Sequence, residues 1–438
     1  MSLRELGDWL DRFLTPRRVG RYAKLIALVA VGALLLSYAV AKSGRTPLGT
    51  TLAADYPQFY VAGKILSDPG RDRLYDLQLQ SRMQVKLFPG ENQALPYAYP
   101  PLVAYVVRPL SYLPYEKAAA IWTICAALFY GVGLFGMWRA CPGMGRAEKW
   151  LGVWICLAFE PFTFECLHGG QISTFAFACV CIAIWMDKEN RPVLSGIAMG
   201  LLAYKPTLLA ILLPAMALGR RWKMLGGCIA TIGFGALLSL VIAGPVACGE
   251  FVRMIGTYGN AVAANDGFRT WKYVDLCAFL RLLHAPREMT VVLPMVGMAG
   301  AGIFLGLIQR SGADWDARAA IWAIALPATL IFNLYVAIYD SVLIVPAFWL
   351  AADWMHRREG GLTKGYRRLG AAVFLAPWIS PGLARLGGFQ IDTVVLGASL
   401  VYMCVVFQAI LQRPARREAL GFKSTDLEAT STAPNLPH

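Results

Sequence analysis

Long apolar blocks separated by short basic loops constrain this chain more than any other feature of its sequence. The 438 residues are 57% hydrophobic and 16% charged, and the apolar residues form continuous runs rather than an alternating pattern. A single water-soluble core cannot use apolar sequence in that form. Because a hydrocarbon layer about 30 Å thick needs roughly 20 apolar residues per helix, we predict an all-α, polytopic membrane bundle of about 12 transmembrane helices.

Most spans can be placed directly from the apolar runs. They are Lys24–Ala41, Ala118–Met137, Trp150–Phe164, Ile172–Met186, Met224–Ala243, Val291–Ile308, Ala317–Val336, Ser341–Trp354, Leu369–Leu383 and Ile391–Leu411. Two segments are ambiguous. Tyr99–Leu113 either crosses the membrane or lies along its interface, and Val193–Leu218 is either one kinked helix or a hairpin that turns at Lys205 and Pro206. Each choice reverses the orientation of every later span.

The short basic loops decide between these alternatives, because the positive-inside rule places such loops on the cytoplasmic side. All of them reach that side only if Tyr99–Leu113 stays at the outer interface and Val193–Leu218 is a hairpin, which gives twelve crossings. The runner-up, a crossing at Tyr99–Leu113 with one kinked helix, leaves two loops outside. The loops are Arg139–Lys149, Lys188–Arg191, Arg220–Lys223, Arg310–Arg318, His356–Arg368 and Arg413–Arg417.

The same membrane topology divides the chain into three parts. Residues 1–23 carry apolar side chains at helical spacing, and we expect a cytoplasmic amphipathic helix there. Residues 24–411 form a single transmembrane domain with outer loops at 42–117 and 244–290, the first holding interfacial helices. The first apolar block lacks a small-residue cleavage site, which favours a retained anchor. Residues 412–438 are a cytoplasmic tail that we expect to be disordered, so both termini are predicted inside.

Charge and cysteine usage indicate which partners to expect. The net charge of +14 comes from clusters between apolar blocks, where Lys and Arg set orientation and meet anionic lipid headgroups. No nucleic-acid recognition motif accompanies them, so membrane lipids and no nucleic acid are expected as partners. The ten cysteines show no CxxC or Cys/His spacing. We therefore predict neither a disulfide framework nor a metal site.

Asp55 stands where the first outer loop returns toward the membrane. The segment after it has an apolar side that includes Phe59 and Ile65, which predicts a helix at the interface. A carboxylate held there can take a proton from a hydroxyl where lipid-soluble and water-soluble reactants meet. With Pro57 in the first turn, Asp55 is equally suited to cap that helix. The sequence leaves both alternatives open.

Lys205 and Asp340 are charged residues at membrane depth. Hairpin arms of about 13 residues reach roughly 20 Å, too short to span, so Lys205 lies below the outer surface and needs water or an anion. A lipid phosphate is the expected partner, and a snorkelling lysine is the alternative. Asp340, beside Tyr339, falls between two apolar spans and is a functional candidate. Its alternative role is to pair with a buried cation such as Lys205.

Two further outer segments carry weaker signals. Glu165, His168 and Gln171 surround a Gly-Gly pair and can either bind sugar hydroxyls or cap helix ends. The second outer loop mixes charged and aromatic residues, which suits phosphate pairing and sugar stacking but is also typical of an interfacial aromatic belt. Its candidates are Arg269 and Lys272 for a donor phosphate and Asp266 for a sugar or acceptor.

These features, in this order, resemble glycosyltransferase family 87, membrane mannosyltransferases of the GT-C superfold. The resemblance covers residues 54–340. It rests on six motifs: an acid-aromatic-AG stretch with its LYD, YPPL, PLSYLP, GGQIS, the KP hairpin and the YD pair. Their residues are Asp55, Phe59, Tyr60, Ala62, Gly63, Leu74–Asp76, Tyr99–Leu102, Pro109–Pro114, Gly170, Gln171, Lys205, Pro206, Tyr339 and Asp340.

The resemblance implies an inverting transfer of a sugar, with mannose expected, from a polyprenyl-phosphate donor to a lipid or glycan acceptor. It implies Asp55 as the base, and neither a nucleotide sugar nor an essential metal or other cofactor. Tyr60, Tyr339 and Asp340 join the sugar and acceptor candidates. The implied location is a bacterial inner (plasma) membrane, with the site facing the periplasm or exterior. Some members carry histidines where this chain has Tyr339 and Asp340, so the acceptor side cannot be copied across.

A transporter or lipid flippase is the rival function, since it too would be a twelve-span bundle with intramembrane charges. Transporters commonly show two halves related by an internal repeat and a site near the bilayer midplane. Here the long first outer loop has no counterpart in the second half, and the charged candidates lie toward one face. Both features favour the enzyme.

Overall fold

The computed structural model describes residues 3–67, 71–89, 95–264, 270–311 and 314–412, and these residues form helices and three isolated β-bridges but no strand. The all-α prediction is therefore confirmed. The helices are α1 Leu3–Phe13, α2 Pro16–Val40, α3 Pro57–Ser67, α4 Leu77–Leu87, α5 Pro101–Val107, α6 Tyr115–Ala140, α7 Arg146–Leu157, α8 Ser173–Lys188, α9 Pro192–Gly200, α10 Leu212–Leu218, α11 Trp222–Ala264, α12 Leu276–Leu282, α13 Arg287–Ser311, α14 Trp315–Ile331, α15 Ile344–Arg358, α16 Lys364–Gly387, α17 Ile391–Val406 and α18 Gln408–Leu411.

Short 3₁₀ and π segments connect or extend several of these helices. They are η1 Arg71–Arg73, η2 Arg108–Tyr112, η3 Pro161–His168, η4 Leu201–Tyr204, η5 Pro206–Leu209, η6 Thr270–Lys272 and η7 Ile338–Leu343. The π-helical η3 continues α7 after a bend of 50°.

Six helices of the described part are long and apolar enough to cross a membrane, or seven if α7 and η3 form one bent span. The long candidates on the outside of the bundle, such as α2 and α13, expose many apolar side chains, including Leu28 and Val296 at 63% each. By contrast α14 and α15 are buried along most of their length. A polytopic bundle whose outer helices face lipid accounts for both observations, while the number of twelve crossings stays a prediction.

The basic loops gather at one end of the bundle. Arg221 pairs with Asp187, Arg318 donates to Asn190, and Arg310 donates to the Leu218 carbonyl, which joins three of the loops. Two more loops meet through Arg357 and Asp353, since Arg357 binds Asp316 and Asp353 while Asp353 accepts the Gly143 N–H. Five of the six predicted loops therefore share one face, and Arg413–Arg417 lies outside the described residues.

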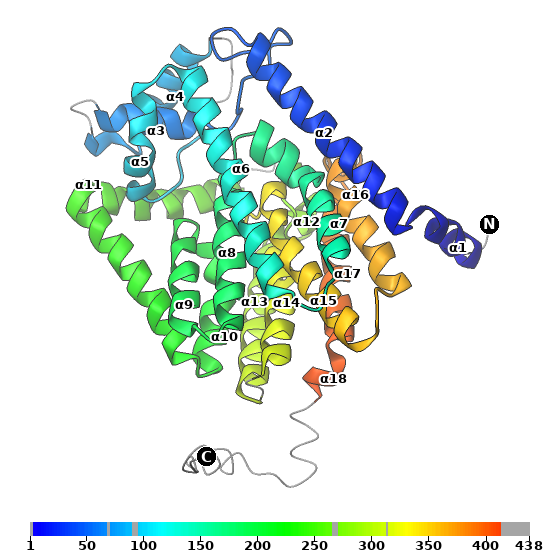
Figure 1. The fold of residues 1–438 in the computed structure, drawn as a ribbon. Coiled ribbons are helices and arrows are strands. Elements are labelled where there is room, and N and C mark those ends of the chain that lie inside the picture. The colour runs from blue at the N-terminus through cyan, green and yellow to red at the C-terminus, as the bar shows by residue number, and fades with distance from the viewer. Residues whose placement is uncertain (1–2, 68–70, 90–94, 265–269, 312–313, 413–438) are drawn as a thin grey trace, which may run out of the picture.

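The two ambiguous segments behave as that arrangement requires. A Cβ built on Gly196 would meet Met224, and one on Gly200 would meet Thr231, so α9 and α11 run in the same direction and the residues between them must turn back. The chain bends at Lys205, whose backbone leaves helical geometry. Tyr99–Leu113 contains the short helices α5 and η2, which pack against α3 beside the start of α6 (Figure 1), as the interfacial alternative predicts.

Three helices of the first outer loop, α3, α4 and α5, form a cap over the end of the bundle opposite the basic loops (Figure 1). The helix expected after Asp55 is present as α3, but it is buried on nearly every side rather than on one face, because α4, α5 and η2 cover it. Asp76, from the LYD motif, accepts the Leu79 N–H as the N-cap of α4. This hydrogen bond, together with the Arg73 guanidinium, lowers the pKa of the Asp76 carboxyl.

The second outer loop also contains more helix than the sequence suggested. Gly244 has a positive φ of 83°, and Pro245 then starts a second arm of α11, as proline favours a first helical turn. This arm runs beneath the cap, where Phe251 lies 5.9 Å from Tyr75 between ring centroids. Asp275 caps α12 and also accepts the Val336 N–H. Burial raises the pKa of Asp275 to about 7.

The ends of the chain depart from the predicted boundaries. The candidate span α2 extends from Pro16, so residues 16–23 of the predicted N-terminal segment continue its helix and α1 is a separate helix before it. Asp11 of α1 binds Arg368 at the start of α16, while Trp9 and Phe13 remain partly exposed. The final span breaks at Phe407 into α17 and α18. Residues 413–438, predicted as a disordered tail, lie outside the described residues.

Candidate active site

A cavity of about 690 Å³ lies between the cap and η3, at the end of the bundle opposite the basic loops. Asp55, Glu165, His168 and Lys272, four of the residues predicted from the sequence, line it together. Its other walls come from α2, from the chain before Asp55, from the cap and the loop after α4, and from η3 and the residue after it. These residues are Leu34, Ser37, Tyr38, Thr46, Thr50, Thr51, Leu52, Ala53, Ala54, Pro57, Gln84, Leu95, Phe164 and Gly169. The site thus combines carboxylates, hydroxyls and a cation.

Asp55 is held to the wall of this cavity by the segment that follows η3. Its backbone N–H donates to the Gly169 carbonyl over 2.7 Å, and its Oδ2 accepts from Gln171 Nε2 over 2.6 Å. Gln58 Nε2 donates to the Asp55 carbonyl over 3.0 Å. Asp55 is 9% exposed and Gln171 4%. Two hydrogen bonds therefore fix the Asp55 backbone and one fixes its carboxylate, at the edge of a space large enough for a sugar.

Gly170 makes this docking possible. Its φ is +77°, and a Cβ built there would lie 2.8 Å from the Ala53 side chain. Trp122 Nε1 donates to the Gly170 carbonyl over 2.8 Å, which fixes the turn against α6. Only glycine satisfies both the backbone conformation and the close approach. The GGQ part of the GGQIS motif is thus a turn that packs closely against the residues before Asp55.

Lys205 and Asp340 form an ion pair rather than lining the cavity. The Lys205 ammonium binds Asp340 Oδ2, Ser173 Oγ donates to Asp340 Oδ1 over 2.7 Å, and the ammonium lies 5.1 Å from the centre of the Tyr339 ring. Asp340 is fully buried and the Lys205 side chain is 19% exposed. The contact that the alternative role of Asp340 requires is therefore present, and the binding of a lipid phosphate by Lys205 stays a prediction.

The remaining candidates divide between the cavity wall and the surrounding packing. His168 lines the cavity, and its Nε2 lies 3.1 Å from the Ala30 carbonyl of α2. Tyr60 instead donates to the Leu113 carbonyl over 2.8 Å and is buried in the cap. Asp266 and Arg269 lie outside the described residues. Ser173, the partner of Asp340, was missed as a site residue although it belongs to the quoted GGQIS motif.

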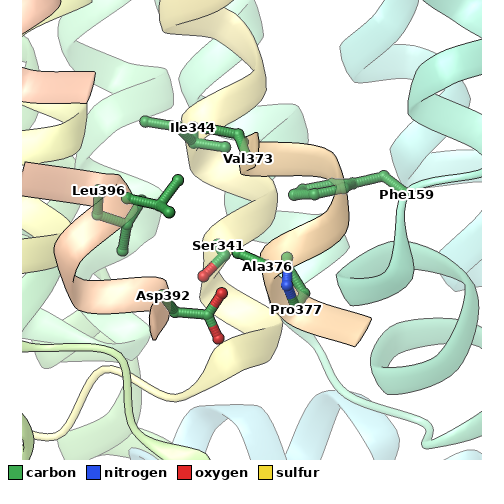
Figure 2. Close-up of a pocket in the computed structure, with 9 residues that line it drawn as sticks. Phe159, Ser341, Ile344, Val373, Ala376, Pro377, Asp392 and Leu396 are labelled. Atoms are coloured by element: carbon green, nitrogen blue, oxygen red, sulfur yellow. The ribbon is translucent and has the colours of Figure 1, made fainter. Parts of the chain in front are cut away.

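A second, much smaller cavity of about 10 Å³ lies deeper in the bundle and shares no lining residue with the first. Figure 2 shows the side chains of Ser341 and Asp392 directed toward each other there. Ser341 Oγ and Asp392 Oδ2 are buried and have no hydrogen-bond partner within the described part of the chain. The volume is close to that of one water molecule, so this cavity is too small for a substrate.

Comparison with known proteins agrees with this geometry. The family model of glycosyltransferase family 87 matches residues 97–333, more than half of the chain. The sequence is also 29% identical, over 73% of this chain and 75% of the other, to the polyprenol-phosphate-mannose-dependent alpha-(1-2)-phosphatidylinositol pentamannoside mannosyltransferase of Mycolicibacterium smegmatis. A multi-pass helical protein with a polar cavity at one end is consistent with both matches. The chain belongs to glycosyltransferase family 87 and is a membrane glycosyltransferase.

Proposed function

We propose that the protein transfers mannose from a polyprenyl-phosphate donor to a hydroxyl group of a lipid or glycan acceptor, with inversion and with Asp55 as the general base. The family supports glycosyl transfer, and the polyprenol-phosphate-mannose dependence of the mycobacterial relative supports the donor class. The observation that carries the proposal is the placement of Asp55 on the wall of the large cavity that Lys272 also lines. The transporter alternative has no comparable support.

The reaction needs one carboxylate and a place for the departing phosphate. Asp55 accepts the proton of the acceptor hydroxyl as its oxygen attacks C1 of the sugar, and the bond between C1 and the phosphate oxygen breaks. Attack from the face opposite the leaving group inverts the configuration at C1. The polyprenyl phosphate leaves with the bonding electrons, so it carries the negative charge that develops in the transition state.

Lys272 is our candidate for the cation that stabilises this negative charge on the leaving phosphate. It is the one Lys or Arg among the described residues that line the cavity, and a cation placed where charge develops lowers the barrier. We assign the phosphate to Lys272 rather than to Lys205, because Lys272 lines the same cavity as Asp55 and Lys205 does not. Glu165, His168 and the Thr46, Thr50 and Thr51 hydroxyls are proposed to contact sugar or acceptor hydroxyls.

The cavity is proposed to face the periplasm or exterior. Asp55 directly precedes α3 of the cap, whereas five basic loops gather at the opposite end of the bundle. Since short basic loops stay in the cytoplasm, the cap lies on the other side. Both termini are then cytoplasmic, in a bacterial inner membrane. This orientation gives the site access to lipid-linked sugars in the outer leaflet.

Purified protein in lipid nanodiscs, supplied with radiolabelled polyprenyl-phosphate mannose and a bacterial lipid extract, tests the proposal. We expect release of polyprenyl phosphate and the appearance of a mannosylated lipid with inverted anomeric configuration. Polyprenyl-phosphate glucose, which changes the sugar, and a nucleotide-linked mannose, which changes the carrier, serve as comparison donors. Consumption of the nucleotide sugar, with none of the polyprenyl-linked donors consumed, would refute the proposed donor class.

A further inference from the structure

The side chain of Gln171, which does not itself line the cavity, contacts the proposed base Asp55. Gln171 Nε2 lies 2.6 Å from Asp55 Oδ2, and both side chains are buried. An amide N–H that donates to a carboxylate stabilises its charged form. It also fixes the plane of the carboxylate, because one of the two oxygens is held in place.

The backbone around Gln171 is fixed independently of its side chain. Gly169 accepts the Asp55 N–H, Gly170 accepts the Trp122 indole N–H, and the Gln171 N–H donates to the Glu165 carbonyl over 3.3 Å. The amide is therefore presented to Asp55 from a rigid support. Gln171 Oε1 accepts no hydrogen bond from any residue that the structure describes. The side chain is thus aimed at Asp55 through its donor end.

We infer that Gln171 is a positioning residue that keeps Asp55 ionised and aligned for proton transfer, rather than a sugar-binding residue as the sequence suggested. This inference rests on the proposed function, in which Asp55 is the base. A base must be deprotonated before the acceptor hydroxyl reaches it. The Gln171 amide meets that requirement at a side chain that is only 9% exposed and so has little contact with water.

Other ionisable groups face Asp55 and contribute to the pH at which it loses its proton. Glu165 and His168 of η3 and Lys272 of η6 line the same cavity, and Tyr38 of α2 closes it. Tyr339 of η7 lies within electrostatic range of Asp55. All of them remain in a Gln171 variant. A change in the pH–rate profile of such a variant therefore reports the loss of the amide itself.

The experiment is the pH dependence of single-turnover transfer by the full-length protein in nanodiscs, with saturating polyprenyl-phosphate mannose. A hydrogen bond to a charged group is worth about 1.5–3 kcal/mol, which corresponds to roughly one to two pH units. We expect the acid limb of the pH–rate profile to move to higher pH by that amount in Gln171→Met. Gln171→Glu should move it further, because two carboxylates in contact share one proton.

Gln80→Met is the matched control. Gln80 is a buried glutamine of the cap that bonds to the Leu74 carbonyl and the Tyr97 N–H and does not line the cavity. Its replacement should reduce the yield of folded protein without moving the acid limb. If both Gln171 variants fold and lose activity by the same factor at every pH, the positioning role is wrong.

The outcome separates this inference from the proposed function. If Asp55→Asn is inactive while Gln171→Met keeps the wild-type acid limb, only the role of Gln171 is refuted. If Asp55→Asn retains transfer activity, the proposed base is wrong and the inference falls with it. Should Gln171→Met fail to fold, the acid limb of Gln171→Glu, which preserves shape and size, decides the question in the same way.

Discussion

The ion pair between Lys205 and Asp340 makes a quantitative prediction about stability. Asp340 is fully buried, and it accepts from Ser173 on one oxygen and from the Lys205 ammonium on the other. Replacing Lys205 by Met leaves a buried carboxylate without its cation, which typically costs about 3–5 kcal/mol. Asp340→Asn should cost less, because the Lys205 side chain is 19% exposed and can reach water.

The double variant decides whether the pair acts as a unit. Lys205→Met with Asp340→Asn removes both charges, and we expect it to lie within about 1 kcal/mol of Asp340→Asn alone. Stability can be measured as the free energy of unfolding in detergent micelles titrated with SDS and monitored by tryptophan fluorescence. The matched control is Arg73→Met, which removes the exposed cation of the pair with Asp76 and should cost at most about 1 kcal/mol.

Two results would contradict this reasoning. One is additivity, in which the double variant loses the sum of the single losses. The other is a well-folded Lys205→Met with unchanged stability but a raised KM for the donor, which would return Lys205 to the phosphate-binding role that the sequence suggested.

Three further predictions test other parts of the structure. Gly170→Ala should lower the free energy of unfolding by about 1–3 kcal/mol and reduce transfer, because its φ is +77° and Ala53 leaves no space for a Cβ. Gly233→Ala in α11 has open space around it and should not destabilise the protein, as SDS unfolding and transfer assays of both variants can check. In a variant without native cysteines, impermeant thiol reagents should label Leu48→Cys from outside intact cells but neither Arg146→Cys nor Lys223→Cys, and the reverse pattern would invert the topology. Burial raises the pKa of Asp275 to about 7, so its ionisation opposes folding and the stability of the protein should fall as the pH rises from about 4 to 7. Thermal-unfolding measurements of Asp275→Asn should show a weaker dependence on pH.

The fold was accessible from the sequence where charge and hydropathy act over long stretches. The basic loops correctly predicted which ends of the helices meet, as the contacts of Arg221, Arg310 and Arg357 show. Short-range features were harder to predict. The second arm of α11 depends on a break at Gly244, and the burial of α3 depends on how α4, α5 and η2 fold back over it, which the pattern within α3 does not record.

The site was accessible in part for the same reason. Asp55, Glu165, His168 and Lys272 were identified as polar residues in outer segments, and the structure brings them to one cavity. Lys205 was identified correctly as a cation in need of an anion, but sequence spacing could not tell a lipid phosphate from Asp340, which lies 135 positions away. The hydroxyls of Thr46, Thr50 and Thr51 carried no pattern that distinguishes them from ordinary loop residues.

The most direct test of the account is single-turnover transfer by Asp55→Asn, measured with radiolabelled polyprenyl-phosphate mannose in nanodiscs. The asparagine preserves the shape of the side chain and a carbonyl oxygen for the Gln171 amide, but it cannot take the proton of the acceptor. Loss of a positioned base typically costs about 10² to 10⁴ in rate. We therefore expect a loss of that size with donor binding and unfolding free energy close to wild type. Transfer at a near wild-type rate would show that Asp55 is not the base, and would direct the search to Glu165 in the same cavity.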